Sequence, residues 1–177
     1  MFEGIFTALI TPFRGGSVDE PALRELVERQ VAAGLDGLVP CGSTGESATL
    51  SHAEHCRVVE LSVEAARGRI QVIAGTGSNN TQESIELTAH AKRAGADGAL
   101  LISPYYNKPT QEGLVAHYAE VARQTDFPLL AYNIPGRTPS NILPSTLARL
   151  AGIEQVVGVK EPSGDIVQIS ELVPASP

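Results

Sequence analysis

The chain has 177 residues, of which 42% are hydrophobic, so it is long and apolar enough for one domain with a sizeable core and is not typical of a disordered protein. Its net charge of −7 argues against a nucleic-acid or anionic-membrane partner. Cys41 and Cys56 have neither metal-ligand spacing nor a disulfide framework, no apolar run reaches transmembrane length, and the N-terminus lacks the basic region of a signal peptide. The sequence therefore predicts a cytoplasmic protein that binds no metal.

Short apolar runs alternate with amphipathic segments along the whole chain. The runs are rich in valine, isoleucine and leucine, which favours buried strands. The expected strands cover residues 5–10, 38–40, 70–74, 98–103, 128–132 and 156–160. Each is followed by a helix whose start is marked by a capping residue or by proline. The expected starts are Asp19 or Glu20, Ser51, Asn80, Thr110, Pro144 and Asp165, and the last helix is expected to run out at residues 174–177.

Six strand–helix units at a spacing of roughly thirty residues predict an α/β fold of the TIM (β/α)8 type, with a doubly wound open sheet as the alternative. A closed barrel needs eight units and about 250 residues. Residues 1–177 are therefore expected to form a partial barrel domain that lacks the last two units and the C-terminal helices. Its first and sixth strands would then have unpaired edges.

The strand over 156–160 ends in a lysine on which the interpretation of the chain depends. Alternate residues of a strand share a face, so Gly158 lies on the same face as Lys160 and leaves room beside its stem. Burial among apolar side chains lowers the pKa of an amine, which can then attack a carbonyl at neutral pH. The strand alone, however, favours the simpler alternative of a lysine that extends into water from a strand end.

Polar loops follow the strands and precede the helices, so they are expected at the one rim where such folds keep their active sites. The turn over 41–47 suits a bound carboxylate or phosphate, or is an ordinary glycine turn. Tyr132 ends its strand as Lys160 does, and is either a proton relay or a core tyrosine. Arg137 either receives a carboxylate or lies at the surface. The turn over 75–77 lacks the full glycine fingerprint of a dinucleotide-binding loop, which argues against a nucleotide site.

Four motifs occur in order along the chain. They are Gly42-Ser43-Thr44-Gly45-Glu46, Tyr105-Tyr106-Asn107-Lys108-Pro109, Tyr132-Asn133-Ile134-Pro135-Gly136-Arg137-Thr138 and Gly158-Val159-Lys160-Glu161. Together they resemble the dihydrodipicolinate synthase family of class I pyruvate aldolases, a superfamily that also contains N-acetylneuraminate lyase. The resemblance covers essentially all of the chain. It implies a lyase of lysine (diaminopimelate) biosynthesis that condenses pyruvate with L-aspartate 4-semialdehyde to 4-hydroxy-tetrahydrodipicolinate, without metal or organic cofactor.

The resemblance also assigns roles, and it reverses the interpretation of Lys160, which matches the Schiff-base lysine. Thr44 and the backbone beside it match the cradle for the pyruvate carboxylate, and Arg137 matches the receptor of the semialdehyde carboxylate. The hydroxyl proton relay is matched by Ser43, Tyr132 and Tyr106. The resemblance implies that Tyr106 is supplied by a neighbouring subunit of a homotetramer, a dimer of dimers.

Seven further positions match the family's feedback site for L-lysine at the dimer interface. They are Ser47, Ala48, His52, His55, Asn79, Glu83 and Tyr105. Glu83 could pair with an ammonium group of the ligand. The alternative is that these are helix-cap and surface residues.

Two departures from the family pattern keep other functions open. Ser43 stands where the family usually has threonine, which resembles the lyase branch, whereas Arg137 in Gly-Arg-Thr favours the synthase. The length fits either an incomplete record or half of a split synthase. The alternatives are an N-acetylneuraminate lyase-like or other pyruvate aldolase, and a truncated non-catalytic remnant.

Overall fold

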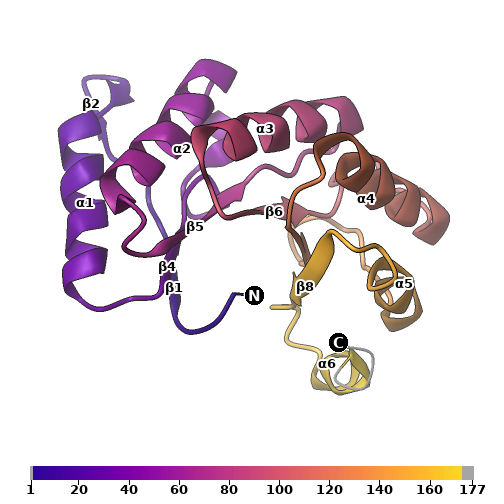
Figure 1. Cartoon of the computed structure of the whole chain (residues 1–177). Coiled ribbons are helices and arrows are strands. Elements are labelled where there is room, and N and C mark those ends of the chain that lie inside the picture. The colour runs from indigo at the N-terminus through magenta and orange to yellow at the C-terminus, as the bar shows by residue number, and fades with distance from the viewer. Residues whose placement is uncertain (1, 173–177) are drawn as a thin grey trace. The chain divides into compact units, whose positions relative to one another are not determined.

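The computed structural model describes residues 2–172, in which short strands alternate with helices (Figure 1). The strands of its main sheet are β1 (Phe6–Ala8), β4 (Gly37–Val39), β5 (Gln71–Gly75), β6 (Gly98–Ile102), β7 (Leu129–Tyr132) and β8 (Val156–Lys160). Their order in the sheet is β1-β4-β5-β6-β7-β8, and β1 with β4, β4 with β5, and β7 with β8 are parallel pairs. A doubly wound sheet reverses its strand order, so this sequential order excludes it. The six predicted strands and an incomplete (β/α) barrel fold are confirmed.

The helices begin where the sequence predicts. They are α1 (Glu20–Ala32), α2 (His52–Ala66), α3 (Thr81–Ala94), α4 (Gln111–Thr125), α5 (Pro144–Leu150) and α6 (Ile166–Leu172). The Asp19 and Thr110 side chains accept hydrogen bonds from the first turns of α1 and α4, and Ser51 and Glu54 form the predicted capping box of α2. The Asn80 side chain accepts from the Gln82 N–H at 3.0 Å, as a cap of α3 should. The predicted end of the last helix at 174–177 lies outside the described residues.

Three short elements were not predicted. A hairpin of β2 (Phe13–Arg14) and β3 (Ser17–Val18) precedes α1, and a 3₁₀ helix, η1 (Ser47–Thr49), precedes α2. Gly15 and Gly16 join the hairpin strands with φ of 59° and 85°. Two positive φ values define a type I′ hairpin turn, for which a Gly-Gly pair is a sequence signal. The hairpin was therefore visible in the sequence, although its strands have only two residues each.

The contacts of the chain define two compact units. Unit 1 consists of Met1–Thr76 and Ala89–Ala99, and unit 2 of Gly77–Thr88 and Leu100–Pro177, so β6 contributes residues to both. In unit 1, α1 packs on α2 and α2 on β5. Its most buried apolar side chains are Leu23, Val27, Leu38, Val58, Val59 and Leu61. In unit 2, α4 packs on α5 and α5 on α6. Its most buried apolar side chains are Leu101, Leu114, Val121, Leu129, Ile142 and Leu150. The fold class is thus confirmed, whereas the assignment of residues 1–177 to one partial barrel domain stays a prediction.

Unit 2 also buries two ionisable rings of α4. The Tyr118 hydroxyl donates a hydrogen bond to the Leu101 carbonyl at 2.9 Å, and burial raises the pKa of Tyr118. His117 is 5% exposed, and its Nδ1 lies 3.0 Å from Oγ1 of Thr81. Burial lowers the pKa of His117 to about 4. The core of unit 2 therefore holds His117 in its neutral form.

We predict that His117 makes the protein less stable in acid. Above pH 6.5, His117 is neutral in the folded and unfolded states and contributes nothing to the pH dependence. Below that pH, His117 binds a proton in the unfolded state, whereas in the folded state it stays neutral down to its pKa of about 4. The free energy of unfolding should then fall by about 1.4 kcal/mol per pH unit, or roughly 2 kcal/mol between pH 6.5 and 5. Urea unfolding of His117→Gln should lack this loss. His52→Gln, at an exposed position, is the control, and an unchanged acid loss in His117→Gln would contradict the prediction.

Candidate active site

Lys160 and Tyr132 lie side by side at the carboxyl ends of two neighbouring strands in unit 2. β7 and β8 pair in parallel with Tyr132 opposite Lys160, and Nζ of Lys160 lies 4.4 Å from the centroid of the Tyr132 ring. Tyr132 is 6% exposed and Lys160 is half-buried. An irregularity in the pairing between Leu129 and Leu130 leaves the alternation from Gly158 to Lys160 intact. The predicted placement of both side chains at strand ends is confirmed.

Two opposing effects act on the Lys160 amine. Loss of water around the amine disfavours its charged form, whereas the face of the Tyr132 ring attracts a cation. Burial has the larger effect, and it lowers the pKa of Lys160. A larger share of the amine is therefore uncharged at neutral pH than for a lysine in water. An uncharged amine with its stem held by the strand is the chemical requirement for attack on a carbonyl.

Arg137 lies on a turn that is fixed from inside. Thr138 is fully buried, and its hydroxyl lies 3.0 Å from the Ile134 carbonyl, 2.9 Å from the Ser140 carbonyl and 3.2 Å from the Ser140 N–H. The Arg137 side chain is exposed, and its guanidinium makes no hydrogen bond or ion pair within residues 2–172. A free guanidinium on a rigid turn can bind a carboxylate through two parallel hydrogen bonds.

Tyr106 extends from the loop between β6 and α4. It is 87% exposed and has a φ of 72°, which is uncommon for a residue other than glycine. The neighbouring Asn107 anchors the loop, because its Nδ2 donates a hydrogen bond to the Asn79 carbonyl at 2.9 Å. The fixed loop leaves Tyr106 available to another molecule. Its predicted role in a neighbouring subunit stays a prediction.

Ser43 and Thr44 form an exposed turn in unit 1. The Gly45 N–H donates to Gly42 at 3.0 Å, whereas the N–H groups of Ser43 and Thr44 donate no hydrogen bond within the described part of the chain. Glycine is required at position 75 behind this turn, because a Cβ there would lie 2.2 Å from the Cys41 carbonyl oxygen. Free N–H groups beside two hydroxyls suit an anion. The turn leads into η1 rather than directly into the first turn of α2.

The residues predicted to bind L-lysine are divided between the two units. In unit 1, Ser47 begins η1, Ala48 and His52 are exposed, and Nε2 of the buried His55 lies 2.8 Å from the Gly75 carbonyl. The alternative interpretation, in which His55 is a helix-cap or surface residue, is therefore wrong about its exposure, because His55 is buried. In unit 2, the Asn79 carbonyl accepts the bond from Asn107, the Glu83 carboxylate accepts a hydrogen bond from the Ser78 hydroxyl, and Tyr105 is half-buried.

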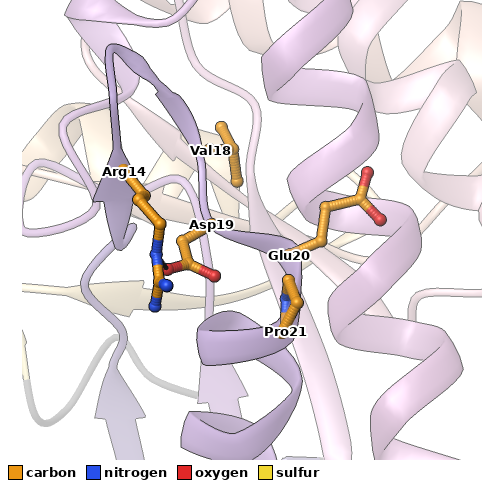
Figure 2. A pocket seen from close by; sticks show the side chains of 5 residues that line it. All are labelled: Arg14, Val18, Asp19, Glu20 and Pro21. Atoms are coloured by element: carbon orange, nitrogen blue, oxygen red, sulfur yellow. Dashed lines mark hydrogen bonds and ion pairs between the residues drawn. The ribbon is translucent and has the colours of Figure 1, made fainter.

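A separate hollow in unit 1 contains none of the predicted site residues. It is lined by Arg14, Val18, Asp19, Glu20 and Pro21 where the β2–β3 hairpin meets α1 (Figure 2). Nε of Arg14 donates to Asp19 at 2.6 Å, and the N–H of Ala22 together with Arg14 lowers the pKa of Asp19. These hydrogen bonds serve the cap of α1, so the hollow has a structural explanation.

Two other features of the described chain bear on its ligands. Within residues 2–172, no three histidine, cysteine, aspartate or glutamate side chains gather into a metal-binding group. No helix among these residues combines the length and hydropathy needed to span a bilayer.

Comparison with known proteins gives consistent relatives. The sequence model of the dihydrodipicolinate synthetase family matches residues 1–176. The 4-hydroxy-tetrahydrodipicolinate synthase of Syntrophobacter fumaroxidans is 60% identical over 173 residues, which cover 98% of this chain and 60% of that protein. The same-named protein of Syntrophus aciditrophicus is 57% identical with the same coverage. The chain thus spans about 60% of the length of these relatives.

Solved structures agree with the sequence relatives. The dihydrodipicolinate synthase from Aquifex aeolicus matches with a TM-score of 0.97 and 50% identity, covering 99% of this chain and 60% of that one. A dihydrodipicolinate synthase from Cyanidioschyzon merolae, solved with lysine bound, matches with a TM-score of 0.94 and 40% identity, covering 97% and 59% of the two chains.

Proposed function

We propose that this chain, which belongs to the dihydrodipicolinate synthetase family, takes part in the condensation of pyruvate with L-aspartate 4-semialdehyde to 4-hydroxy-tetrahydrodipicolinate. One observation carries the proposal. The half-buried Lys160 amine, with a lowered pKa, lies 4.4 Å from the centroid of the Tyr132 ring at the end of β8. The names of the relatives support the choice of a synthase over a lyase.

The proposed reaction begins with attack of Nζ of Lys160 on the ketone carbon of pyruvate. Water leaves and an iminium forms, which draws electrons from the adjacent methyl carbon. That carbon loses a proton and becomes an enamine, which forms a carbon–carbon bond to the aldehyde carbon of the second substrate while the aldehyde oxygen takes up a proton. The amino group of the second substrate then displaces Lys160 from the iminium carbon, which closes the ring of the product and frees the lysine.

The other residues take roles that fit their chemistry. Tyr132, Ser43 and Tyr106 relay the protons, because hydroxyl groups can pass a proton without placing a full charge in a water-poor site. Thr44 and its free backbone N–H hold the pyruvate carboxylate, a role supported by the unpaired N–H groups of that turn. Arg137 holds the carboxylate of the second substrate. The homotetramer and the cytoplasmic location stay predictions.

Trapping with borohydride tests the central step. Borohydride reduces an iminium to a stable secondary amine, so pyruvate and borohydride together should label Lys160. The chain has three lysines, Lys92, Lys108 and Lys160, and peptide mapping by mass spectrometry distinguishes them. Lys160→Arg should abolish labelling, because a guanidinium stays protonated and is a poor nucleophile. Lys108→Arg, in an exposed loop, is the matched control. Labelling at Lys92 or Lys108 alone, or none, would contradict the Schiff-base mechanism.

Arg137→Ala tests the acceptor site separately from the pyruvate site. Loss of a charge-assisted contact costs about 1.5–3 kcal/mol, so kcat/KM for the semialdehyde should fall roughly 10- to 150-fold. Labelling of Lys160 by pyruvate should stay within about twofold, because Arg137 acts only on the second substrate. Arg149→Ala, an exposed arginine of α5, is the control. Equal loss of labelling and condensation would show that the Arg137 turn is structural. A preference for N-acetylmannosamine as acceptor would favour the lyase.

L-lysine is proposed to inhibit the reaction through the seven residues that match the family's feedback site. A relative solved with lysine bound supports the proposal, and so does the Glu83 carboxylate, which can attract an ammonium group. Millimolar lysine corresponds to a binding free energy of about 4 kcal/mol and should lower the rate. Glu83→Ala should relieve this inhibition, whereas Glu86→Ala, three positions further along α3, should not. A rate that saturating lysine leaves unchanged would count against the site.

A further inference from the structure

Directly behind the Lys160–Tyr132 pair lies a contact that the sequence analysis did not single out. Asn133 follows Tyr132 and Glu161 follows Lys160, and Nδ2 of Asn133 donates a hydrogen bond to Oε2 of Glu161 at 2.6 Å. The Asn133 N–H also donates to the Lys160 carbonyl at 3.0 Å, which continues the β7–β8 ladder by one residue. Asn133 is fully buried. The ends of the two strands are thus joined through both backbone and side chains.

The geometry of a strand separates this contact from the reacting groups. Successive side chains of a strand point to opposite faces, and the ladder continues through the Asn133 N–H, so Asn133 lies on the face opposite to Tyr132. The Glu161 carboxylate accepts a hydrogen bond from the Asn133 side chain and therefore lies on the side of Asn133. A substrate bound at the Lys160 amine would therefore not touch them. Any effect that they have on the reaction must pass through the position of their neighbours.

Glu161 gathers donors from three segments of unit 2. Its Oε2 also accepts from Nε2 of Gln168 on α6 at 3.1 Å, and its Oε1 accepts from the Ser163 N–H at 3.1 Å. β8 and α6, the two labelled elements near the C-terminal end in Figure 1, are therefore connected through one carboxylate. Glu161 is half-buried, and hydrogen bonds to a carboxylate are the stronger kind, so the loss of one of them is costly.

Asn133 fixes the loop that carries Arg137 as well. Its Oδ1 accepts from the Ile142 N–H at 2.9 Å, and its Nδ2 lies 2.9 Å from Oδ1 of Asn141. These bonds hold the chain where it returns from the turn over 134–140. One amide therefore contacts the ends of both strands and the base of the Arg137 loop.

We propose that Asn133 and Glu161 are positioning residues for the chemistry at Lys160. Their hydrogen bond fixes the end of β8 against the end of β7, and thereby sets where the Lys160 amine lies relative to the Tyr132 ring and to a bound pyruvate. This inference rests on the proposed function, because it assumes that Lys160 attacks a carbonyl. A displacement of about 1 Å at a reacting group can cost roughly 100-fold in rate.

The test separates the rate of labelling from its amount. Purified protein is mixed with saturating pyruvate and with borohydride at a concentration beyond which the rate no longer rises, and the reduced adduct on Lys160 is followed in time. Asn133→Asp has nearly the same shape, keeps the acceptor for the Ile142 N–H, and replaces the donor toward Glu161 with a second carboxylate oxygen. The labelling rate should fall about 10- to 100-fold, while the final adduct per folded protein stays unchanged.

Exchange of the two partners tests the contact itself. Glu161→Gln alone should also slow labelling, because it turns one acceptor oxygen into a donor. In the double variant Asn133→Asp with Glu161→Gln, donor and acceptor have changed places across the same gap. The neighbouring Asn141 and Gln168 amides bond to each other in both directions, so both can turn over to match the exchanged pair, and at least about tenfold of the rate should return. Such a rescue is a coupling between the two positions, which residues with independent roles do not show.

The chain supplies a matched control at the other ends of the same strands. Nε2 of Gln155 donates to Oδ1 of Asp126 at 3.1 Å, an amide–carboxylate contact that joins the segments entering β8 and β7. Gln155→Glu makes the same chemical change as Asn133→Asp, and it should leave the labelling rate within about twofold.

Four results would overturn the inference. An unchanged rate in Asn133→Asp, with normal labelling of the unaltered protein, rejects the positioning role but keeps the proposed function. A fall in the amount of adduct that parallels a loss of urea stability shows a structural role only. Additive effects in the double variant show that the Asn133–Glu161 hydrogen bond is not responsible. Absence of any adduct on Lys160 in the unaltered protein rejects the proposed function and this inference together.

Discussion

The parallel pairing of β7 with β8 is the interaction on which the candidate site depends. It sets Tyr132 opposite Lys160, and this register brings the Lys160 amine to 4.4 Å from the centroid of the Tyr132 ring. A slip by one residue would turn every side chain of β8 to the other face and remove the amine from the ring. The site is therefore a property of strand register first, and of the individual side chains second.

The proposed role of Lys160 as a nucleophile depends on a balance of two effects in its surroundings. Full burial would expel the charge altogether, whereas full exposure would leave the amine protonated. Lys160 is half-buried, and the Tyr132 ring offers a weak attraction, of about 0.5–2 kcal/mol, to a cation. Burial outweighs it, so the pKa is lowered. In the proposed reaction the same ring surface attracts the positive iminium, so that the interaction is retained after the amine has reacted.

The sequence predicted the strands and the helix starts because their signals are local. Valine-rich runs, the Ser51–Glu54 capping box and Thr110 each act within a few residues. The positions of Lys160 and Tyr132 could also be predicted, since the end of a strand and the face on which each of its residues lies follow from the local sequence. Two features could not be predicted, because each depends on the partner strand. They are the irregularity in pairing between Leu129 and Leu130 and the Asn133–Glu161 hydrogen bond. Glu161 lies 28 positions from Asn133, and nothing in either local pattern predicts the other.

A half-buried carboxylate at the junction of two strands carries a cost, since apolar side chains would avoid the partial removal of a charge from water. Glu161 offsets that cost with hydrogen bonds from Asn133, Gln168 and the Ser163 N–H. The three donors come from the end of β7, from α6 and from the turn after β8, so the carboxylate is satisfied only when all three segments are in place. An apolar contact would tolerate small shifts of any one of them, because dispersion has no preferred direction. Directional bonds from three sides favour one arrangement, in which Lys160, the residue before Glu161, lies at the Tyr132 ring. If Glu161 has the proposed positioning role, a correctly placed amine requires all three of these segments.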